Sequence, residues 1–417
     1  MTASTEPYIY ADNAATTPLS SRALHAMMPY LTSEFGNPSG IHRIARNAAL
    51  ALKDAREVVG HALNAKHSDE IYFTSGGTEA DNWVLRGAVQ RFRDLHGTHA
   101  TPRIVTSAIE HHAILHCCEA LEREGVEVIY LPVDAQGRIN PTDLERTLRE
   151  NEQRAKEADA GCSAGPATAL VSIMLANNEV GTIQPIRQLA DIAHAHGAPF
   201  HTDAVQAVGH IPVDIQQLGI DALSLSGHKF HGPRGTGALY LREGFSIPAL
   251  IAGGSQERGE RAGTENLAGI IGMAEALSEA CTTLEQDIAR IVSLRDELTN
   301  HILSAVEGVS PTGAASVRSD ELVRLPSIAS FTCDAVDGEL LVVLLDRAGV
   351  AAATGSACST GSTEPSHVLT AMGIDAARAK GALRISLASD VTADDIRLLC
   401  DRIPAAIKRA HLLSGTV

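Results

Sequence analysis

The stretch Ala222-Leu223-Ser224-Leu225-Ser226-Gly227-His228-Lys229 is a short apolar run that ends in small residues and a lysine. An earlier run, Phe200-His201-Thr202-Asp203, ends in an acid 26 positions before that lysine. Short apolar runs of this kind are typical of strands buried on both faces of a sheet. The two stretches therefore predict an acid at the end of one buried strand and a lysine at the end of another.

The lysine and the acid are the two side chains that pyridoxal phosphate needs from a protein. A lysine amine can condense with the cofactor aldehyde, and a carboxylate can pair with the pyridinium nitrogen and keep the ring protonated. A lysine in a loop of glycine and histidine can equally be a solvated surface residue. The pairing of Lys229 with Asp203 is thus a hypothesis that depends on the rest of the chain.

Outward from these runs, apolar stretches of strand length alternate with helical patterns. Strands are expected at 71–74, 104–106, 126–131, 169–175, 200–202, 222–226 and 237–241, and helices at 78–91, 112–124, 141–154 and 186–196. Short apolar strands separated by helices indicate parallel pairing, and hence an α/β sandwich. Gly235-Thr236-Gly237 indicates a tight return that would make one strand antiparallel.

The remainder of the chain predicts a second, smaller domain. From Thr264 to about Ser304 the pattern is helical with few breakers, which is long enough to leave the first domain. From Ile328 onward, short strands and helices indicate an α+β domain. Residues 150–168, which are polar and rich in alanine and glycine, are expected to form an exposed insertion, and residues 311–324 a surface loop.

Composition excludes several classes of protein. A chain of 417 residues with 44% hydrophobic content can bury a sizeable core, and a formal net charge of −16 opposes binding to nucleic acid. The seven cysteines form no CxxC pair and are odd in number, which indicates reduced thiols. No apolar stretch is expected to span a membrane, and the N-terminus has no signal-peptide pattern. We therefore expect a cytoplasmic protein.

Three further stretches carry polar groups at strand ends. Thr74-Ser75-Gly76-Gly77-Thr78-Glu79-Ala80 joins a strand to a helix, where first-turn N–H groups could bind phosphate, although an ordinary capped turn has the same pattern. In Ile109-Glu110-His111-His112, an imidazole could stack on a flat ring or move protons. Asn178, after an apolar strand, could donate to the phenolic oxygen of the cofactor or form an Asx turn.

A metal site is the competing interpretation of the histidines. His112 and His116 are four residues apart on the expected helix, which is a spacing that allows joint binding. No HExxH motif and no obvious third ligand accompany them. We therefore expect no metal.

The last candidates lie near the C-terminus. Cys358 lies in Ala353-Thr354-Gly355-Ser356-Ala357-Cys358-Ser359-Thr360-Gly361-Ser362, whose small residues offer little apolar surface to pack against. A mobile, solvent-reached thiol is expected there, and an inert loop cysteine is the alternative. Arg384, in Leu383-Arg384-Ile385-Ser386, places a guanidinium fork on a short strand where it could bind a substrate carboxylate.

Together these motifs resemble the cysteine desulfurases of the class-V aminotransferase family, in the NifS/IscS-like group with a long catalytic-cysteine loop. The matching stretches run nearly end to end: Ala11 to Pro18, Phe35 to Ser39, Thr74 to Glu79, Glu110-His111, Ala176 to Gly181, His201 to Gln206, Ser224 to Lys229, Gln256 to Gly259, Gly263 to Asn266 and Gly355 to Cys358. The group's usual serine pair before Gly-Ser-Ala-Cys is here Ala353-Thr354.

The resemblance implies fold type I of the pyridoxal-phosphate-dependent transferases, with a mostly parallel seven-stranded sheet. It also implies an N-terminal segment joining the small domain, a large cofactor-binding domain, and a linking helix with the small domain, over residues 1–15, 16–263 and 264–417.

The resemblance assigns a role to each candidate. Catalysis would involve Lys229, which carries pyridoxal phosphate, His111, which stacks on the ring and shuttles protons, and Cys358, which takes the substrate sulfur as a persulfide. The other cofactor-binding residues would be Gly77, Thr78, Asn178, Asp203, Gln206, Ser226, Gly227, His228 and, across a homodimer interface, Thr264. Asn178 and Arg384 would bind the carboxylate of L-cysteine.

The implied activity is conversion of L-cysteine to L-alanine, with transfer of sulfur to an acceptor such as an iron–sulfur scaffold protein. A selenocysteine lyase shares the scaffold, and an aminotransferase or decarboxylase of the same fold is the next alternative. Cys358 argues against the aminotransferase, which needs no such thiol. A cofactor-binding regulator would require a DNA-binding segment, and no helix-turn-helix pattern or basic patch is evident.

Overall fold

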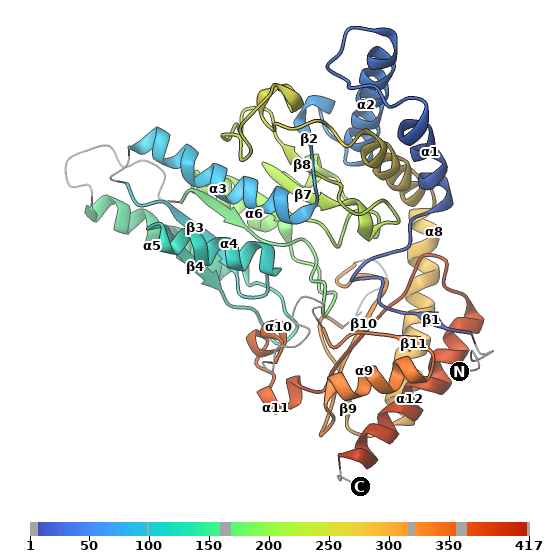
Figure 1. Cartoon of the computed structure of the whole chain (residues 1–417). Coiled ribbons are helices and arrows are strands. Elements are labelled where there is room, and N and C mark those ends of the chain that lie inside the picture. The colour runs from blue at the N-terminus through green and yellow to red at the C-terminus, as the bar shows by residue number, and fades with distance from the viewer. Residues whose placement is uncertain (1–6, 98–99, 159–167, 316–321, 356–364, 415–417) are drawn as a thin grey trace.

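The computed structural model describes residues 7–97, 100–158, 168–315, 322–355 and 365–414 (Figure 1). Its centre is a seven-stranded sheet in the order β2-β8-β7-β6-β5-β3-β4. The strands are β2 (Ile71–Thr74), β3 (Arg103–Ser107), β4 (Glu127–Leu131), β5 (Leu170–Ser172), β6 (Phe200–Asp203), β7 (Ala222–Ser226) and β8 (Gly237–Leu241). Only β8 runs antiparallel to its neighbours in this sheet, which confirms the predicted α/β fold and its one reversed strand.

Helices cover both faces of the sheet, and the period-2 alternation of each strand decides which side chain faces which layer. On one face, Ile104 and Leu170 pack with α3 and α4. On the other, Val105 and Val171 pack with the remaining helices of this half. The helices are α1 (Ser21–Thr32), α2 (Arg43–Ala62), α3 (Gly77–His96), α4 (His112–Arg123), α5 (Pro141–Ala158), α6 (Ile186–Ala195) and α7 (Ile215–Leu218). Burial on both faces explains why these strands carry continuous apolar runs.

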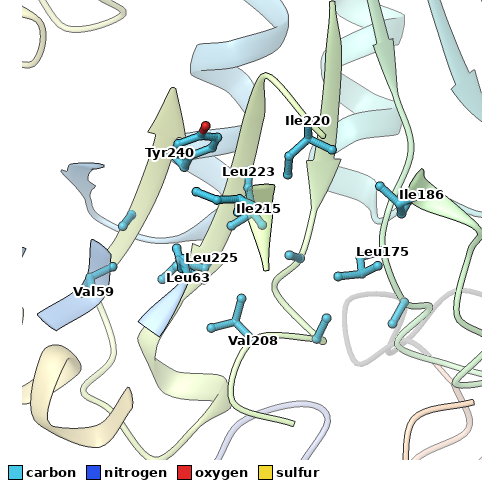
Figure 2. Packing of buried hydrophobic residues seen from close by; sticks show 14 of the residues in the cluster. Val59, Leu63, Leu175, Ile186, Val208, Ile215, Ile220, Leu223, Leu225 and Tyr240 are labelled. Carbon is cyan, nitrogen blue, oxygen red and sulfur yellow. The ribbon is translucent and has the colours of Figure 1, made fainter. Parts of the chain in front are cut away.

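Figure 2 shows the larger of these layers from close by. Leu223 and Leu225 of β7 and Tyr240 of β8 point into a cluster that also receives Val59 of α2 and Ile215 of α7. The cluster lies behind the strands that carry the acid and the lysine. It therefore fixes the backbone from which those two polar side chains project.

One helix, α8 (Leu267–Ala305), connects the two halves of the molecule (Figure 1). The side chain of Asn266 caps its start by accepting from the N–H of Gly269. Near that end, Met273 and Leu277 belong to the core of the large half, whereas Leu298 and Ile302 near the other end belong to a second core.

The second core lies under a three-stranded antiparallel sheet in the order β12-β10-β9. A separate parallel pair joins β1 to β11, so residues near the N-terminus lie against the C-terminal half. The elements of this half are β1 (Ile9–Tyr10), β9 (Val309–Pro311), β10 (Ile328–Cys333), α9 (Gly338–Arg347), β11 (Val350–Ala351), α10 (His367–Ala371), α11 (Ala376–Ala379), β12 (Ala382–Ser386) and α12 (Ala393–Leu413).

Three sequence expectations need correction. Of the expected insertion 150–168, residues 150–158 form the end of α5, because their glutamate, glutamine, arginine, lysine and alanine residues favour helix, and residues 159–167 lie outside the described residues. In the expected surface loop 311–324, Pro311 ends β9, and Thr312, Ala314 and Arg324 are buried, with the Arg324 Nε donating to the carbonyl of Val180 at 3.2 Å; residues 316–321 lie outside the described residues. Helix α8 is apolar and long enough to cross a bilayer by length and composition, contrary to expectation, although half of its most apolar window is buried within the fold.

Candidate active site

A cavity of about 250 Å³ opens where the two halves of the molecule meet. Strands β6 and β7 and the start of α3 form its wall on the large half, and β12 contributes Arg384 from the other half. Ligands of open α/β sheets bind in such a crevice outside the carboxyl ends of the strands. The cavity brings together ten of the predicted site residues, among them Lys229, Asp203 and Arg384.

Lys229 enters the cavity from a single helical turn, Gly227–Lys229, that follows β7 directly. Its Nζ donates to the carbonyl oxygens of Ala14 at 2.6 Å and of Ala15 at 3.0 Å. Gly227 makes the turn possible because a Cβ there would lie 2.9 Å from Cγ of Met273. The amine is therefore held at the cavity by a backbone segment that lies more than 200 residues away in the chain.

Asp203 is the last residue of β6 and is buried in the same wall. Burial raises the pKa of its carboxyl to about 6, and the N–H of Val205 and the charge of Lys229 oppose that rise. The N–H of Val205 donates to Oδ1 at 2.8 Å, which fixes the carboxyl in one orientation. A buried carboxylate of this kind gains most from a cationic partner in the cavity.

The start of α3 is the part of the cavity that can bind an anion. Its N-cap residue, Gly76, offers no side-chain acceptor to the first-turn N–H groups, and Gly77 and Thr78 line the cavity. A Cβ on Gly77 would lie 2.5 Å from Cγ2 of Val205, so only glycine fits. Ser226 and His228 complete this corner. Burial and the charge of Lys229 lower the pKa of His228 to about 4.

His111 lies at the N-cap of α4, where its Nδ1 accepts from the N–H of Ala113 at 3.1 Å. Burial, together with the charge of Lys229, lowers its pKa to about 4. The imidazole is therefore neutral near pH 7. Because Nδ1 acts as an acceptor, the ring proton belongs on Nε2.

Arg384 has a side chain that is only 2% exposed. Its Nη2 donates to Oδ1 of Asp12 at 2.7 Å, and its Nη1 donates to the carbonyl of Asn178 at 2.9 Å. Its Nε is buried and has no hydrogen-bond partner among the described residues. The edge of the guanidinium that carries Nε is thus available to a carboxylate in the cavity.

Two other predicted side chains have different placements. Gln206 lines the cavity, and its Nε2 donates to the carbonyl of Ala14 at 2.9 Å. Thr264 is exposed and lies outside the cavity lining of its own chain.

Cys358 lies outside the described residues, but both described flanks of its segment lie beside the cavity. Ala353 and Arg384 exchange backbone hydrogen bonds of 3.2 and 2.7 Å. On the other side, the Ser366 hydroxyl donates to Oε2 of Glu179 at 2.6 Å, and Glu179 follows Asn178 of the cavity wall.

The histidines that suggested a metal site form a ring cluster near His111. His112 lies 4.9 Å between ring centroids from both His116 and His367. Burial lowers the pKa of His112, and the two neighbouring imidazoles lower it further. No group of three potential ligands in the described part of the chain could hold a metal ion.

Several polar residues of the site were not identified from the sequence. Asp12 fixes Arg384, Asp81 lines the cavity, and Glu110 is buried next to His111. Asp12 and Glu110 lie within the motifs that resemble those of cysteine desulfurases, so their positions could have identified them as site residues. Asp81 could not have been identified in this way, because an acid within a helical pattern is usually a solvated residue.

Comparisons with known proteins agree with this geometry. The family profile "Aminotransferase class-V" matches residues 9–399. A cysteine desulfurase named IscS from Methanosarcina thermophila is 43% identical over 406 residues, covering 97% of this chain and 93% of the relative. A solved structure titled "NIFS-LIKE PROTEIN" has a TM-score of 0.85 at 34% identity, covering 96% of this chain and 100% of its own. A structure of SspA in complex with cysteine has a TM-score of 0.73 at 33% identity, covering 91% and 98%.

Proposed function

The chain belongs to the class-V aminotransferase family and is a cysteine desulfurase, and we propose that it uses pyridoxal phosphate and passes the sulfur of L-cysteine through Cys358 to an acceptor protein. The observation that carries the proposal is that Lys229, Asp203 and Arg384 open on one cavity. The resemblance to cysteine desulfurases that the motifs indicated is confirmed by the comparisons.

The cavity fits pyridoxal phosphate at three points. Lys229 offers an amine to the aldehyde, Asp203 offers a buried carboxylate to the ring nitrogen, and the uncapped start of α3 offers N–H groups to the phosphate. When bound, pyridoxal phosphate accepts the electron pair that is left when a bond to Cα of an amino acid breaks. Asp203 would keep a proton at the ring nitrogen, because a cationic partner offsets the cost of burying its charge.

Two groups of the chain can move protons near the substrate. The Nζ of Lys229, as a free amine, would be the base that accepts a proton from Cα of the substrate. The Nε2 of His111 carries a proton on a neutral ring and can donate it, while Nδ1 remains bound to the N–H of Ala113. Asn178 and Gln206 lie on the same wall as donors for the oxygen atoms of the cofactor or substrate.

The sequence places Cys358 three residues after Gly355, which is the last described residue before it. Gly355 itself is close to the wall, because a Cβ there would lie 2.7 Å from Oε2 of Glu179. Among the described cysteines, burial raises the pKa of Cys117 to about 11 and of Cys333 to about 12, which makes both poor nucleophiles.

Arg384→Lys tests how the substrate carboxylate is bound. An ammonium cannot reproduce the fork that serves Asp12, Asn178 and the substrate together. Since a charge-assisted hydrogen bond is worth roughly 1.5–3 kcal/mol, we expect KM for L-cysteine to rise by about one to two orders of magnitude. Arg378→Lys, which affects an exposed pair with Asp334, is the matched control and should leave KM unchanged. Equal KM values for both variants would exclude Arg384 as the carboxylate anchor.

We also propose a homodimer in which Thr264 reaches the cavity of the partner subunit. Thr264 is exposed and absent from the cavity of its own chain. Leu24, Met28 and Leu31 are exposed at helical spacing on α1, and Ile41 nearby is 90% exposed. An apolar surface of this kind is typical of an interface.

Ile41→Asp tests the homodimer without disturbing the protomer core. Because Ile41 is exposed in the single chain, a charge there should destabilise only an interface. We expect sedimentation equilibrium to show a shift towards monomer, together with weaker binding of pyridoxal phosphate. Leu412→Asp, at an exposed position on α12, should remain dimeric. A dimeric Ile41→Asp protein would contradict this choice of interface.

The cellular context is a further part of the proposal. We propose a cytoplasmic protein that supplies iron–sulfur cluster assembly, and the five described cysteines, all of them free thiols, support a reducing compartment. The direct test is to incubate the purified protein with pyridoxal phosphate and L-cysteine, and to measure alanine and sulfide. Alanine without reducible sulfur on the protein would contradict transfer through Cys358.

A further inference from the structure

A second buried carboxyl group, besides that of Asp203, lines the cavity. Asp81, on the second turn of α3, is 1% exposed and lines the same cavity as Asp203. Its Oδ1 is buried and has no hydrogen-bond partner among the described residues. A buried acid with an unpartnered oxygen is costly, so its position in the wall calls for a function.

A row of three hydrogen-bonded side chains on the sheet lies against Asp81. Ser172 Oγ lies 2.9 Å from Nδ1 of His201, and Nε2 of His201 lies 2.9 Å from Oγ of Ser224. Nε2 of His201 also lies 3.8 Å from Oδ1 of Asp81. Complete burial lowers the pKa of His201 to about 3, so its ring is neutral, with one nitrogen donating and the other accepting.

The groups around Asp81 are mostly acids. Asp203 and the neutral His201 face it from β6, Glu110 lies before α4, and Cys117 lies on α4. Burial raises the pKa of Glu110 to about 8, against hydrogen bonds from Ser107 and the N–H of Met174. Burial also raises the pKa of Asp81 well above its usual range, and the charge of Asp203 raises it further. Three buried carboxyls near the one amine of Lys229 cannot all be ionised.

We propose that Asp81 is a positioning residue that acts together with Asp203: of these two buried carboxyls in the wall of one cavity, Asp81 keeps its proton and Asp203 carries the charge. The pair places a single negative charge where the ring nitrogen of the cofactor would lie. Two neighbouring carboxyl groups whose surroundings move their pKa values apart are an established way to keep one acid neutral while the other is ionised.

The first experiment uses cofactor-free protein, so it does not depend on the proposed function. Asp81 has a raised pKa in the folded state, so the folded protein keeps a proton that the unfolded chain loses above about pH 4. Stability is therefore lost as pH rises towards the folded-state pKa. The variant D81N keeps the shape and has nothing to titrate. Its Tm relative to the wild type should increase between pH 5 and pH 8, by about 2 °C or more.

The matched control is D54N, an exposed aspartate on α2, whose Tm difference from the wild type should not change with pH. If Asp81 had only a packing role, D81N would shift Tm by the same amount at every pH. A Tm difference without pH dependence would overturn the proposal.

The second experiment rests on the proposed function and measures the Kd of pyridoxal phosphate in a double-mutant cycle. D81N alone should change Kd by less than about threefold, because it preserves the neutral group. D203N should weaken binding, and adding D81N to it should cost about a further tenfold, because Asp81 can carry the charge once Asp203 cannot. Equal costs of D81N in both backgrounds would overturn the pairing. An unchanged Kd for D203N would overturn the placement of the ring nitrogen, while the Tm series would still decide whether Asp81 holds a proton.

Discussion

Lys229→Ala is expected to lose turnover and the covalent attachment of pyridoxal phosphate together. The Lys229 amine lies in the cavity with Asp203, at the end of a turn that no other lysine shares. Loss of a group that both holds the cofactor and moves a proton should reduce kcat by at least roughly 10²- to 10⁴-fold. The variant can still bind the cofactor non-covalently through the start of α3 and Asp203. Its visible absorption band should then be that of the free aldehyde.

The measurement is borohydride reduction of the loaded protein followed by peptide mass spectrometry. The wild type should carry the reduced cofactor on the peptide that contains Lys229, and the variant should carry none. Lys66→Ala is the matched control, because Lys66 is exposed and pairs only with Glu243 on the surface. Reduced cofactor on a different lysine of an active Lys229→Ala protein would show that the assignment is wrong.

Cys358→Ser is expected to bind cofactor and L-cysteine normally and to form no persulfide. A serine hydroxyl is far less ionised than a thiol near neutral pH, so it is a poor acceptor of sulfur. Sulfide production should therefore fall to background. Mass spectrometry after incubation with L-cysteine should show one added sulfur on the Cys358 peptide of the wild type and none on that of the variant.

Cys281→Ser is the control for this experiment, because Cys281 is an exposed thiol far from the cavity residues in sequence. It should retain full activity and persulfide formation. Burial raises the pKa of Cys118, Cys333 and Cys400, which predicts that none of them replaces Cys358. Persulfide on one of these cysteines, with full activity in Cys358→Ser, would refute the nucleophile assignment.

Most strands of the central sheet could be predicted because they are buried on both faces and therefore consist of apolar runs, whereas the edge strand β4 is only partly buried. The end of α5 could not, because its last two turns are polar and carry little apolar periodicity. The order of the strands in the sheet could not be predicted either, because no local sequence pattern indicates the crossover connections that place β3 beside β5. The burial of Arg324 could not be predicted, because its partner is the backbone carbonyl of Val180, which has no sequence signature.

The candidate site was predictable where a residue ends a strand or starts a helix, as with Asp203, Lys229 and Thr78. At each of these positions a polar side chain lies next to the turn at which a strand or helix ends or begins. Asp81 lies inside a helix, where burial depends on which face meets the sheet. A single sequence does not show that Ser172, His201 and Ser224, on three separate strands, form one row behind it.

Helix α8 holds the two halves of the cavity at a fixed position relative to each other. It has 39 residues and a length of about 58 Å, and its two ends belong to different cores. A flexible linker would leave Arg384 and Lys229 to find each other at an effective concentration set by random coil statistics, which is of millimolar order for short linkers. A rigid rod anchored at both ends removes that search. The substrate therefore encounters a carboxylate anchor and a reactive amine already held in register, and none of its binding energy is needed to bring them together.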